Sequence, residues 1–442
     1  ADLVHGSLRA CAGGCAAVFG APRGRERTAV PRLREATGAA PLDRTDVTSV
    51  RTSLRTADRR AHGPQGQNLR RPDRGTYRPS SARSARGVAM DVGIITNPNS
   101  KKNYRRPQRR RALEQAVGRY GAVVETRSLE ELPRAIRALR EGGCRYYVCD
   151  GGDGTLHWVL NTLYREIAQT TPPGEAPKLP IVVPTNGGTV DFVARKAGLK
   201  GDADSIVRRL VGRLERGETI PTVTINTCRL TGAPAKPASS DSAQAPGFDR
   251  IGLASALGGV AQAFFDRFYA LPKERGALAI AGVIGAAAGS ALVSSLAPPL
   301  QRFLPGEMRS YATEFFRPTR ARVEVDGREL PFASFASMQV GAIDINLAGV
   351  VRAFRHAREG GVLHFQALDT SPMGVVANVP NIVLGTPILG RKVYDDRARH
   401  VRIVAEDGEI LNPVIDGEQF FGLTRVDLTL GPRVELPTFN AN

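Results

Sequence analysis

The sequence predicts an α/β domain with a parallel sheet, followed by a domain built mainly from short β-strands. Between residues 90 and 220, short apolar runs alternate with stretches of helical periodicity. Beyond about residue 220, the chain holds many short strand-like runs separated by Gly and Asp turns. Residues 1–89 show neither period. We therefore expect a disordered basic extension over 1–89, an α/β domain over 90–220 and a β-rich domain over 221–442.

The α/β prediction rests on the order of the elements. Each predicted strand is a short apolar run that ends in a polar or Gly-rich turn, and each predicted helix has spaced apolar residues. We expect strands at 92–96, 123–127, 146–149 and 180–183, and helices at 107–119, 129–140, 156–169 and 190–197. This alternation predicts a parallel sheet with crossover helices, which binds ligands beyond the carboxyl ends of its strands.

The β-rich prediction rests on runs at 222–230, 322–325, 335–340, 362–366, 401–404 and 425–429. Many short strands are typical of a sandwich or barrel. Residues 231–247 are small, polar and Pro-rich, which predicts a long loop. Residues 277–297 carry no charge, but they are mostly Ala, Gly and Ser. This composition favours a buried or membrane-facing helix over a membrane-spanning one.

The composition excludes a fully disordered chain and a protein that spans the membrane many times, because 42% of residues are hydrophobic and 24% are charged. Of the net charge of +18, the first 89 residues carry +10, from 17 Arg against 7 Asp and Glu. A basic arm can bind nucleic acid or anionic lipid. Phe19 and Tyr77 are the only aromatic residues there to stack on bases, so we expect no nucleic-acid partner and an extension without a selected role. Alternatively, the native chain begins at Met90.

Five scattered cysteines without metal-ligand spacing indicate a reducing compartment, so we expect a cytoplasmic protein.

Three polar or glycine-rich loops follow predicted strands and carry the chemistry. Glycines let the backbone approach an anion, and a helix start directs N–H groups and partial positive charge towards it. The carboxyl ends of parallel strands share one sheet edge, so the loops predict a nucleotide site. The candidate residues are Asn97 and Ser100 in the first loop, Gly151, Gly152, Asp153, Gly154 and Thr155 in the second, and Gly187, Gly188 and Thr189 in the third.

These motifs resemble those of the diacylglycerol kinase catalytic-domain family, which includes bacterial lipid kinases, sphingosine kinases and ceramide kinases. NAD kinases and phosphofructokinases share the GGDGT-type loop, but other segments distinguish the families. The first loop is similar to the family's NPxSG opening, and residues 187–195 are similar to its GGTxNxxAR segment. Residues 251–268 resemble the small-residue segment that begins the lipid domain, and residues 416–418 match the family's DGE.

The resemblance implies an ATP-dependent lipid kinase acting on diacylglycerol or a related long-chain lipid alcohol. A phosphofructokinase-like or NAD-kinase-like first domain would bind ATP with Mg²⁺, and a β-sandwich second domain would hold the lipid. The three loops would bind the nucleotide, with Asp153 near the reacting phosphate. Asp416 and Glu418 would act near the acceptor hydroxyl and the metal. The base is Asp153 or Asp416, with a slight preference for Asp416, and no metal ligand is assigned.

A lipid substrate implies peripheral contact with an anionic membrane surface. The candidate basic patch comprises residues 104–106 and 109–111. A solvated helix face is the alternative.

Several features leave other functions open. The family usually has Asn where Asp191 stands and Glu where Trp158 stands, and a charge at position 191 near phosphates needs a compensating cation. Residues 341–361 lack the family's GGG cluster and its acid–acid–Gly pattern. Asp-Gly is also a common hairpin pair, both at Asp416 and at Asp326. The alternatives are a soluble kinase of the NAD-kinase type and a catalytically weak nucleotide- or lipid-binding homologue.

Overall fold

Four short apolar strands form the parallel sheet of the first lobe. The computed structural model describes residues 90–100, 102–188, 191–235, 247–270, 282–283, 285–291, 306, 311–347 and 351–439. The extension predicted over 1–89 therefore lies outside the described residues. The strands are β1 (Val92–Thr96), β2 (Gly121–Glu125), β3 (Tyr146–Asp150) and β4 (Ile181–Pro184), in the order β2-β1-β3-β4, and all their pairings are parallel. The predicted α/β class is confirmed.

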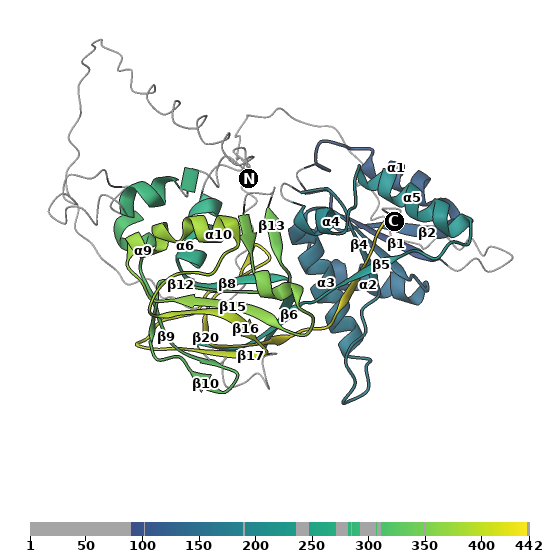
Figure 1. Cartoon of the computed structure of the whole chain (residues 1–442). Helices are drawn as coiled ribbons and strands as arrows, with labels where there is room; N and C mark the ends of the chain where they lie inside the picture. Colours follow the sequence, from purple (N-terminus) through teal and green to yellow (C-terminus); the bar gives the residue numbers. More distant parts are fainter. Residues whose placement is uncertain are drawn as a thin grey trace, which may run out of the picture. The chain divides into compact units, whose positions relative to one another are not determined.

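Helices cover both faces of this sheet. They are α1 (Arg109–Val117), α2 (Leu132–Glu141), α3 (Asp153–Ala168), α4 (Phe192–Lys196) and α5 (Ala203–Glu215). Across the sheet, the step from β1 to β2 runs towards one edge, whereas the steps from β2 to β3 and from β3 to β4 run towards the opposite edge. Right-handed crossovers therefore place α1 on one face and α2 and α3 on the other. Figure 1 shows α1 beside α5 and α2 beside α3, in agreement with their contacts.

The apolar core of the first lobe includes residues from far along the chain. Strand β21 (Val434–Pro437) pairs antiparallel with β5 (Thr222–Ile225) and packs against β4. Val434 and Leu436 are buried in the same cluster as the residues of β1 and β3. The core of the first lobe is thus completed by a strand from the end of the described chain.

The described part of the second lobe contains two large antiparallel sheets and a separate two-stranded hairpin. The first has the order β10-β9-β17-β20-β6-β7, with β11 paired to β9, and consists of β6 (Cys228–Pro234), β7 (Phe248–Gly252), β9 (Thr319–Val325), β10 (Arg328–Glu329), β11 (Ser334–Phe335), β17 (His400–Ala405) and β20 (Leu423–Leu430). The second has the order β16-β15-β12-β8-β18-β19 and consists of β8 (Ala254–Gly259), β12 (Ser337–Gly341), β15 (Leu363–Leu368), β16 (Val393–Ala398), β18 (Val414–Ile415) and β19 (Glu418–Gln419).

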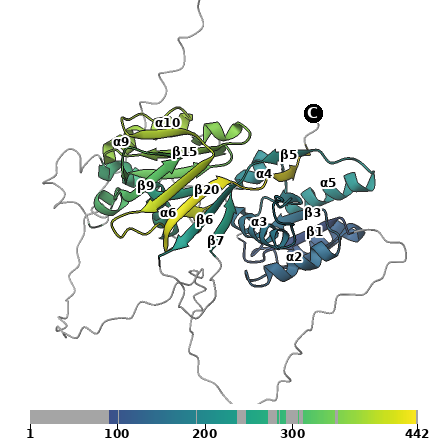
Figure 2. The same ribbon diagram turned by 90° about the horizontal axis from the view of Figure 1, so that it is seen from below.

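The two sheets share one apolar core, so the predicted sandwich is confirmed. Val323 of β9 and Leu428 of β20 are buried in the same cluster as Met338 of β12 and Phe365 of β15. Both views show these strands in two layers (Figures 1 and 2). Alternating burial along β9 and β20 directs every second side chain into the core.

Helices flank the sandwich and form a smaller core. The described helices are α6 (Val260–Ala270), α9 (Pro372–Ala377) and α10 (Val379–Leu384), and α6 packs against β8 and β12. A cluster that includes Val283, Ala287 and Phe316 packs against Phe264 of α6. The uncharged segment 277–297 is described only at 282–283 and 285–291, where it is helical. Within the described residues, no helix is long and apolar enough to cross a membrane.

The structure differs from the sequence prediction at several elements. The helix expected from residue 156 begins at Asp153, because Gly152 serves as its N-cap in an extended conformation. The single strand expected over 222–230 is two strands, β5 and β6, which belong to different sheets. Alternation of apolar residues indicates a strand but not its partner. The predicted loop over 231–247 begins later, since β6 extends to Pro234, and residues 236–246 lie outside the described part.

We expect Leu436→Ala to destabilise the first lobe, although residue 436 is distant from it in sequence. Leu436 is 1% exposed in the core of that lobe. Truncation of a buried Leu costs about 2–5 kcal/mol. Denaturant unfolding followed by the fluorescence of Trp158, the sole tryptophan, measures this loss. Glu435→Ala, on the same strand, is the control, and equal losses in the two variants would contradict the role of β21.

Candidate active site at the carboxyl edge of the parallel sheet

A buried carboxylate fixes the sheet edge at which the three predicted loops meet. Asp150, the last residue of β3, is fully buried and pairs with Arg109 of α1 at 2.9 Å. Thr96 Oγ1 at the end of β1 donates to Asp150 Oδ2 at 2.7 Å, and Asn103 Nδ2 donates to the same oxygen at 3.0 Å. Arg109 also pairs with Asp204 of α5. Asp150 therefore ties the first and second loops to two helices.

The glycines of the second and third loops allow the two loops to pack directly against each other. Gly187 N–H donates to Gly151 O at 3.1 Å. A Cβ added at Gly187 would lie 2.5 Å from that oxygen, and one added at Gly152 would lie 2.8 Å from the Cα of Gly188. The structure thus brings these predicted residues together, apart from Thr189, which lies outside the described residues.

The first loop reaches the start of α3. Asn97 Nδ2 donates to Thr155 Oγ1 at 3.2 Å, which joins two predicted site residues. Ser100 Oγ is buried and has no hydrogen-bond partner among the described residues. A buried hydroxyl without a hydrogen-bond partner costs free energy. A phosphate oxygen could accept a hydrogen bond from Ser100 Oγ at this site.

Asp191 has the compensating cation that its position requires. Lys102 Nζ lies 3.1 Å from Asp191 Oδ2, and the other carboxylate oxygen accepts from Gly188 N–H at 2.7 Å. Asp191 has a φ of 50°, a left-handed conformation that is uncommon outside glycine. Its side chain and backbone therefore hold the third loop in place. The sequence indicated the need for a cation but not that Lys102 provides it.

Asp416 is both a hairpin residue and a site residue. Asp416 and Gly417, with φ values of 51° and 90°, form the two-residue turn between β18 and β19. Asp416 Oδ1 accepts from the N–H groups of Leu253 and Ala254 at 2.8 and 3.0 Å. Oδ2 lies 3.1 Å from His157 Nδ1. The turn directs this carboxylate of the second lobe towards α3 of the first.

His157 is a site residue that the sequence analysis did not identify. It is buried one turn into α3, and Asn161 Nδ2 lies 3.3 Å from its Nε2. Asn161 Oδ1 accepts from Ile251 N–H, and Asn161 Nδ2 donates to the carbonyl oxygens of His157 and Ile251 at 2.9 and 2.8 Å. Because an ionised Asp416 can only accept, His157 Nδ1 carries the proton donated to its Oδ2. The only sequence signal was its place two residues beyond the glycine loop.

Asp153 and Glu418 complete the acidic group at the start of α3. Burial, followed by the charges of Asp191 and Asp416, raises the pKa of Asp153 to about 7. The Cβ of an alanine at position 154 would lie 2.6 Å from Glu418 Oε1, so this carboxylate lies directly over Gly154. The structure therefore brings all three predicted catalytic residues to the glycine loop.

Trp158 packs on the second lobe rather than facing the loops. Its ring centroid lies 6.0 Å from that of Phe420, which also contacts the ring of Phe248 at 5.3 Å. His157 contacts Trp158 edge-on at 5.3 Å. An aromatic side chain at position 158 thus adds apolar contact beside the His157–Asp416 hydrogen bond.

A metal site formed by the protein alone is not present in the described residues, where no group of three or more His, Cys, Asp and Glu side chains could hold an ion.

One family model and several solved structures are similar to this chain. Residues 91–221 match the family model of the diacylglycerol kinase catalytic domain. A candidate diacylglycerol kinase from Bacillus anthracis str. Sterne has a similar structure, with 12% identity, a TM-score of 0.51 and coverage of 80% of this chain and 99% of the other. A diacylglycerol kinase structure from the same organism has 11% identity and a TM-score of 0.47, with coverage of 79% of this chain and 97% of the other. At these identities the likeness shows the fold alone. The comparison with curated proteins found no match.

We expect Gly187→Ala to separate the second and third loops, because the added methyl would lie 2.5 Å from the Gly151 oxygen. Both thermal stability and nucleotide binding should fall. Gly212→Ala in α5 is the matched control, since its nearest neighbour would be 3.5 Å away and Ala stabilises a helix by roughly 0.5–1 kcal/mol over Gly. A Gly187→Ala protein with the stability and nucleotide affinity of the wild type would contradict this packing.

We expect Asp153→Asn to stabilise the protein more at pH 8 than at pH 5. The pKa of Asp153 is about 7 when folded, against an ordinary value of 3.8 for an Asp side chain. Between these values the folded state retains a proton that the unfolded state releases, so the wild type loses stability as pH rises towards 7. The Asn variant has no such loss. Melting temperatures at both pH values test this, with exposed Asp407→Asn as a control. A difference that is equal at both pH values would contradict it.

Proposed function

We propose that this protein transfers the γ-phosphoryl group of ATP to the hydroxyl of diacylglycerol or a related long-chain lipid alcohol, because residues 91–221 match the family model of the diacylglycerol kinase catalytic domain. The family supports a phosphotransferase. The observation that carries the finer assignment is the hydrogen bond between His157 of α3 and Asp416 of the second lobe. It holds a carboxylate next to the glycine loop, where an acceptor hydroxyl would meet the phosphate.

The triphosphate would lie across the sheet edge. The start of α3 supplies N–H groups and partial positive charge, and the unpartnered Ser100 hydroxyl supplies a donor. Lys102 neutralises Asp191, so the third loop presents less negative charge to the phosphates. Mg²⁺ is usually held by one or two carboxylates together with substrate phosphates. Glu418, next to Gly154, would supply such a carboxylate to ions that arrive with ATP.

Asp416 is the proposed base. Two N–H groups occupy Oδ1, and His157 occupies one side of Oδ2, which leaves one lone pair of Oδ2 for the substrate hydroxyl. The carboxylate takes the hydroxyl proton as that oxygen forms a bond to the γ-phosphorus. The bond from phosphorus to the β–γ bridging oxygen breaks, and ADP leaves with that electron pair. His157 is a positioning residue, because it acts on the reaction through its hydrogen bond to Asp416.

A lipid substrate requires contact with the bilayer, and we propose a cytoplasmic protein that binds anionic membranes peripherally. The basic patch expected at residues 104–106 and 109–111 has few free charges. Arg106 pairs with Asp202, Arg110 with Glu114, and Arg109 is 10% exposed beside Asp150. Tyr104, which is 81% exposed, remains available there.

The substrate assignment is tested by incubating the full chain with labelled ATP, Mg²⁺, mixed long-chain lipid alcohols and NAD. We expect label in the lipid fraction. Label in NAD would instead identify a kinase of the NAD-kinase type. ATP binding without transfer to either would identify a catalytically weak homologue.

We expect Asp416→Asn to lower kcat at least about 100-fold, because general-base catalysis contributes 10²–10⁴-fold. His157→Phe should lower kcat with little change in KM for ATP, because the base loses its orientation but the loops remain. Trp158→Phe keeps the aromatic contact and is the control for folding of α3. If Asp416→Asn and Asp153→Asn both retain full lipid phosphorylation, the site assignment is wrong.

A further inference from the structure

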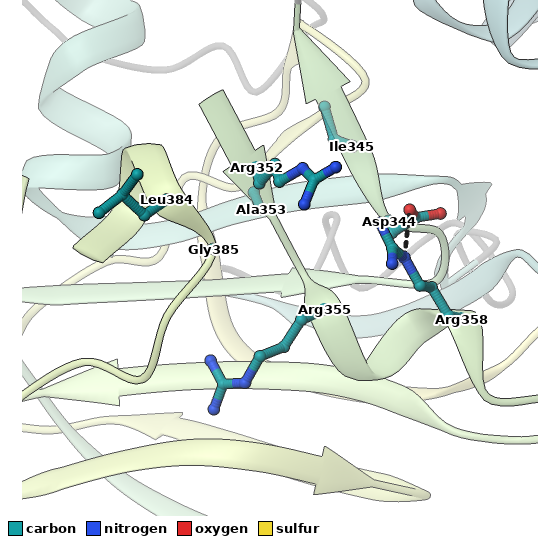
Figure 3. Close-up of a pocket in the computed structure, with 8 residues that line it drawn as sticks. All are labelled: Asp344, Ile345, Arg352, Ala353, Arg355, Arg358, Leu384 and Gly385. Carbon is teal, nitrogen blue, oxygen red and sulfur yellow. Dashed lines mark hydrogen bonds and ion pairs between the residues drawn. The ribbon is translucent and has the colours of Figure 1, made fainter. Parts of the chain in front are cut away.

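A second site lies on the sandwich lobe, where Asp344 pairs with Lys196 of α4. It is a pocket between the hairpin of β13 (Ile345–Leu347) and β14 (Val351–Ala353) and the end of α10. The residues that line it are Asp344, Ile345, Arg352, Ala353, Arg355, Arg358, Leu384 and Gly385. Figure 3 shows Arg352 between Leu384 and Asp344.

Three arginines give the pocket an excess of positive charge. Arg355 pairs with Asp395 at 2.8 Å, and Arg358 pairs with Asp344 at 2.7 Å. Asp344 also pairs with Lys196 of α4. Arg352 is exposed and has no ion pair with another described residue. The four basic side chains are the three arginines and Lys196, and the two carboxylates are Asp344 and Asp395. Together these six side chains carry a net charge of about +2, which attracts an anion.

Two exposed leucines adjoin these arginines. Leu384 and Leu389 are 65% and 69% exposed, and among the described large apolar residues only Tyr104 is more exposed. Leu384 itself lines the pocket. The residue before Leu389, Ile388, donates its N–H to the same Asp395 oxygen that Arg355 contacts. Asp395 therefore links Arg355 to the backbone next to Leu389.

We propose that this pocket binds the phosphate of an anionic phospholipid in a bilayer, with Leu384 and Leu389 inserted among the lipids around it. Guanidinium groups bind phosphate through several donors, and exposed leucines gain free energy on leaving water. No aromatic residue lines the pocket to stack on a nucleic-acid base. The inference rests on the proposed function in one respect, since an enzyme that acts on a membrane lipid needs such a contact.

Arg352 is the residue to change, because its guanidinium has no partner among the described side chains whose loss would disturb the fold. The full chain is mixed with sedimenting vesicles of neutral phosphatidylcholine, with and without anionic phosphatidylglycerol. Wild-type protein should bind the anionic vesicles preferentially. Arg352→Gln should bind them about fivefold more weakly, as expected for roughly one interfacial charge, and Leu389→Ser should also weaken binding.

The matched control is Arg322→Gln, which removes an exposed arginine of β9 elsewhere on the same lobe. If Arg352→Gln and Leu389→Ser bind anionic vesicles as tightly as Arg322→Gln does, the proposal is wrong. It is equally wrong if millimolar inorganic phosphate displaces the wild type at constant ionic strength, which would indicate a site for free phosphate. If Arg105→Gln weakens vesicle binding more than Arg352→Gln does, the membrane contact lies on the first lobe, and the proposal is also wrong.

Phosphorylation of a short-chain diacylglycerol dissolved without membranes separates this inference from the proposed function. Arg352→Gln should retain wild-type activity in that assay. Absence of activity in the wild type would count against the proposed function, whereas vesicle binding alone decides the inference about the pocket.

Discussion

The buried ion pair between Asp150 and Arg109 is the interaction on which the candidate site depends. Asp150 is 0% exposed, and an unpaired charge there would be very costly. Its oxygens accept from the end of β1, from the first loop and from α1. These bonds set the positions of the strand ends, and the strand ends set the positions of the glycine loops. Removal of Arg109 would leave the buried Asp150 carboxylate without its cation. The end of β1, the first loop and α1 would then lose their common anchor.

Two aspartates with left-handed backbones hold the opposite sides of the site. Asp191 and Asp416 have φ values of 50° and 51°, a conformation that costs a non-glycine residue free energy. Asp191 accepts the N–H of Gly188 in its own loop, and Asp416 accepts the N–H of Leu253 before β8, which offsets part of that cost. Each also meets a basic or imidazole group from another element, Lys102 or His157. The strained turns are therefore stabilised by the same bonds that orient their carboxylates.

Strands and loops that depend on local residue patterns could be predicted from the sequence. Short apolar runs with polar turns located β1, β3 and β4, and the strand-end loops located the residues that now lie around Asp153. What it missed depends on distant contacts. His157 became a site residue only because the Asp416 hairpin faces it, and Lys102 only because the third loop folds back beside it. The partner of β5 could not be predicted, because β21 is about 200 residues away and alternation does not specify a partner. No sequence motif marks Arg352, because its pocket forms only where the β13–β14 hairpin meets the end of α10.

The return of β21 to the first lobe has a consequence for biosynthesis. A ribosome makes the parallel sheet first, but Val434 and Leu436 can pack against it only after the sandwich strands that precede β21 have been made. Until then, β5 and the adjoining apolar surface of β4 remain uncovered, and such surfaces and unpaired edges favour aggregation. The nascent lobe is therefore a natural client for chaperones during translation of the intervening sandwich. The core of this lobe is completed only after β21 has been translated.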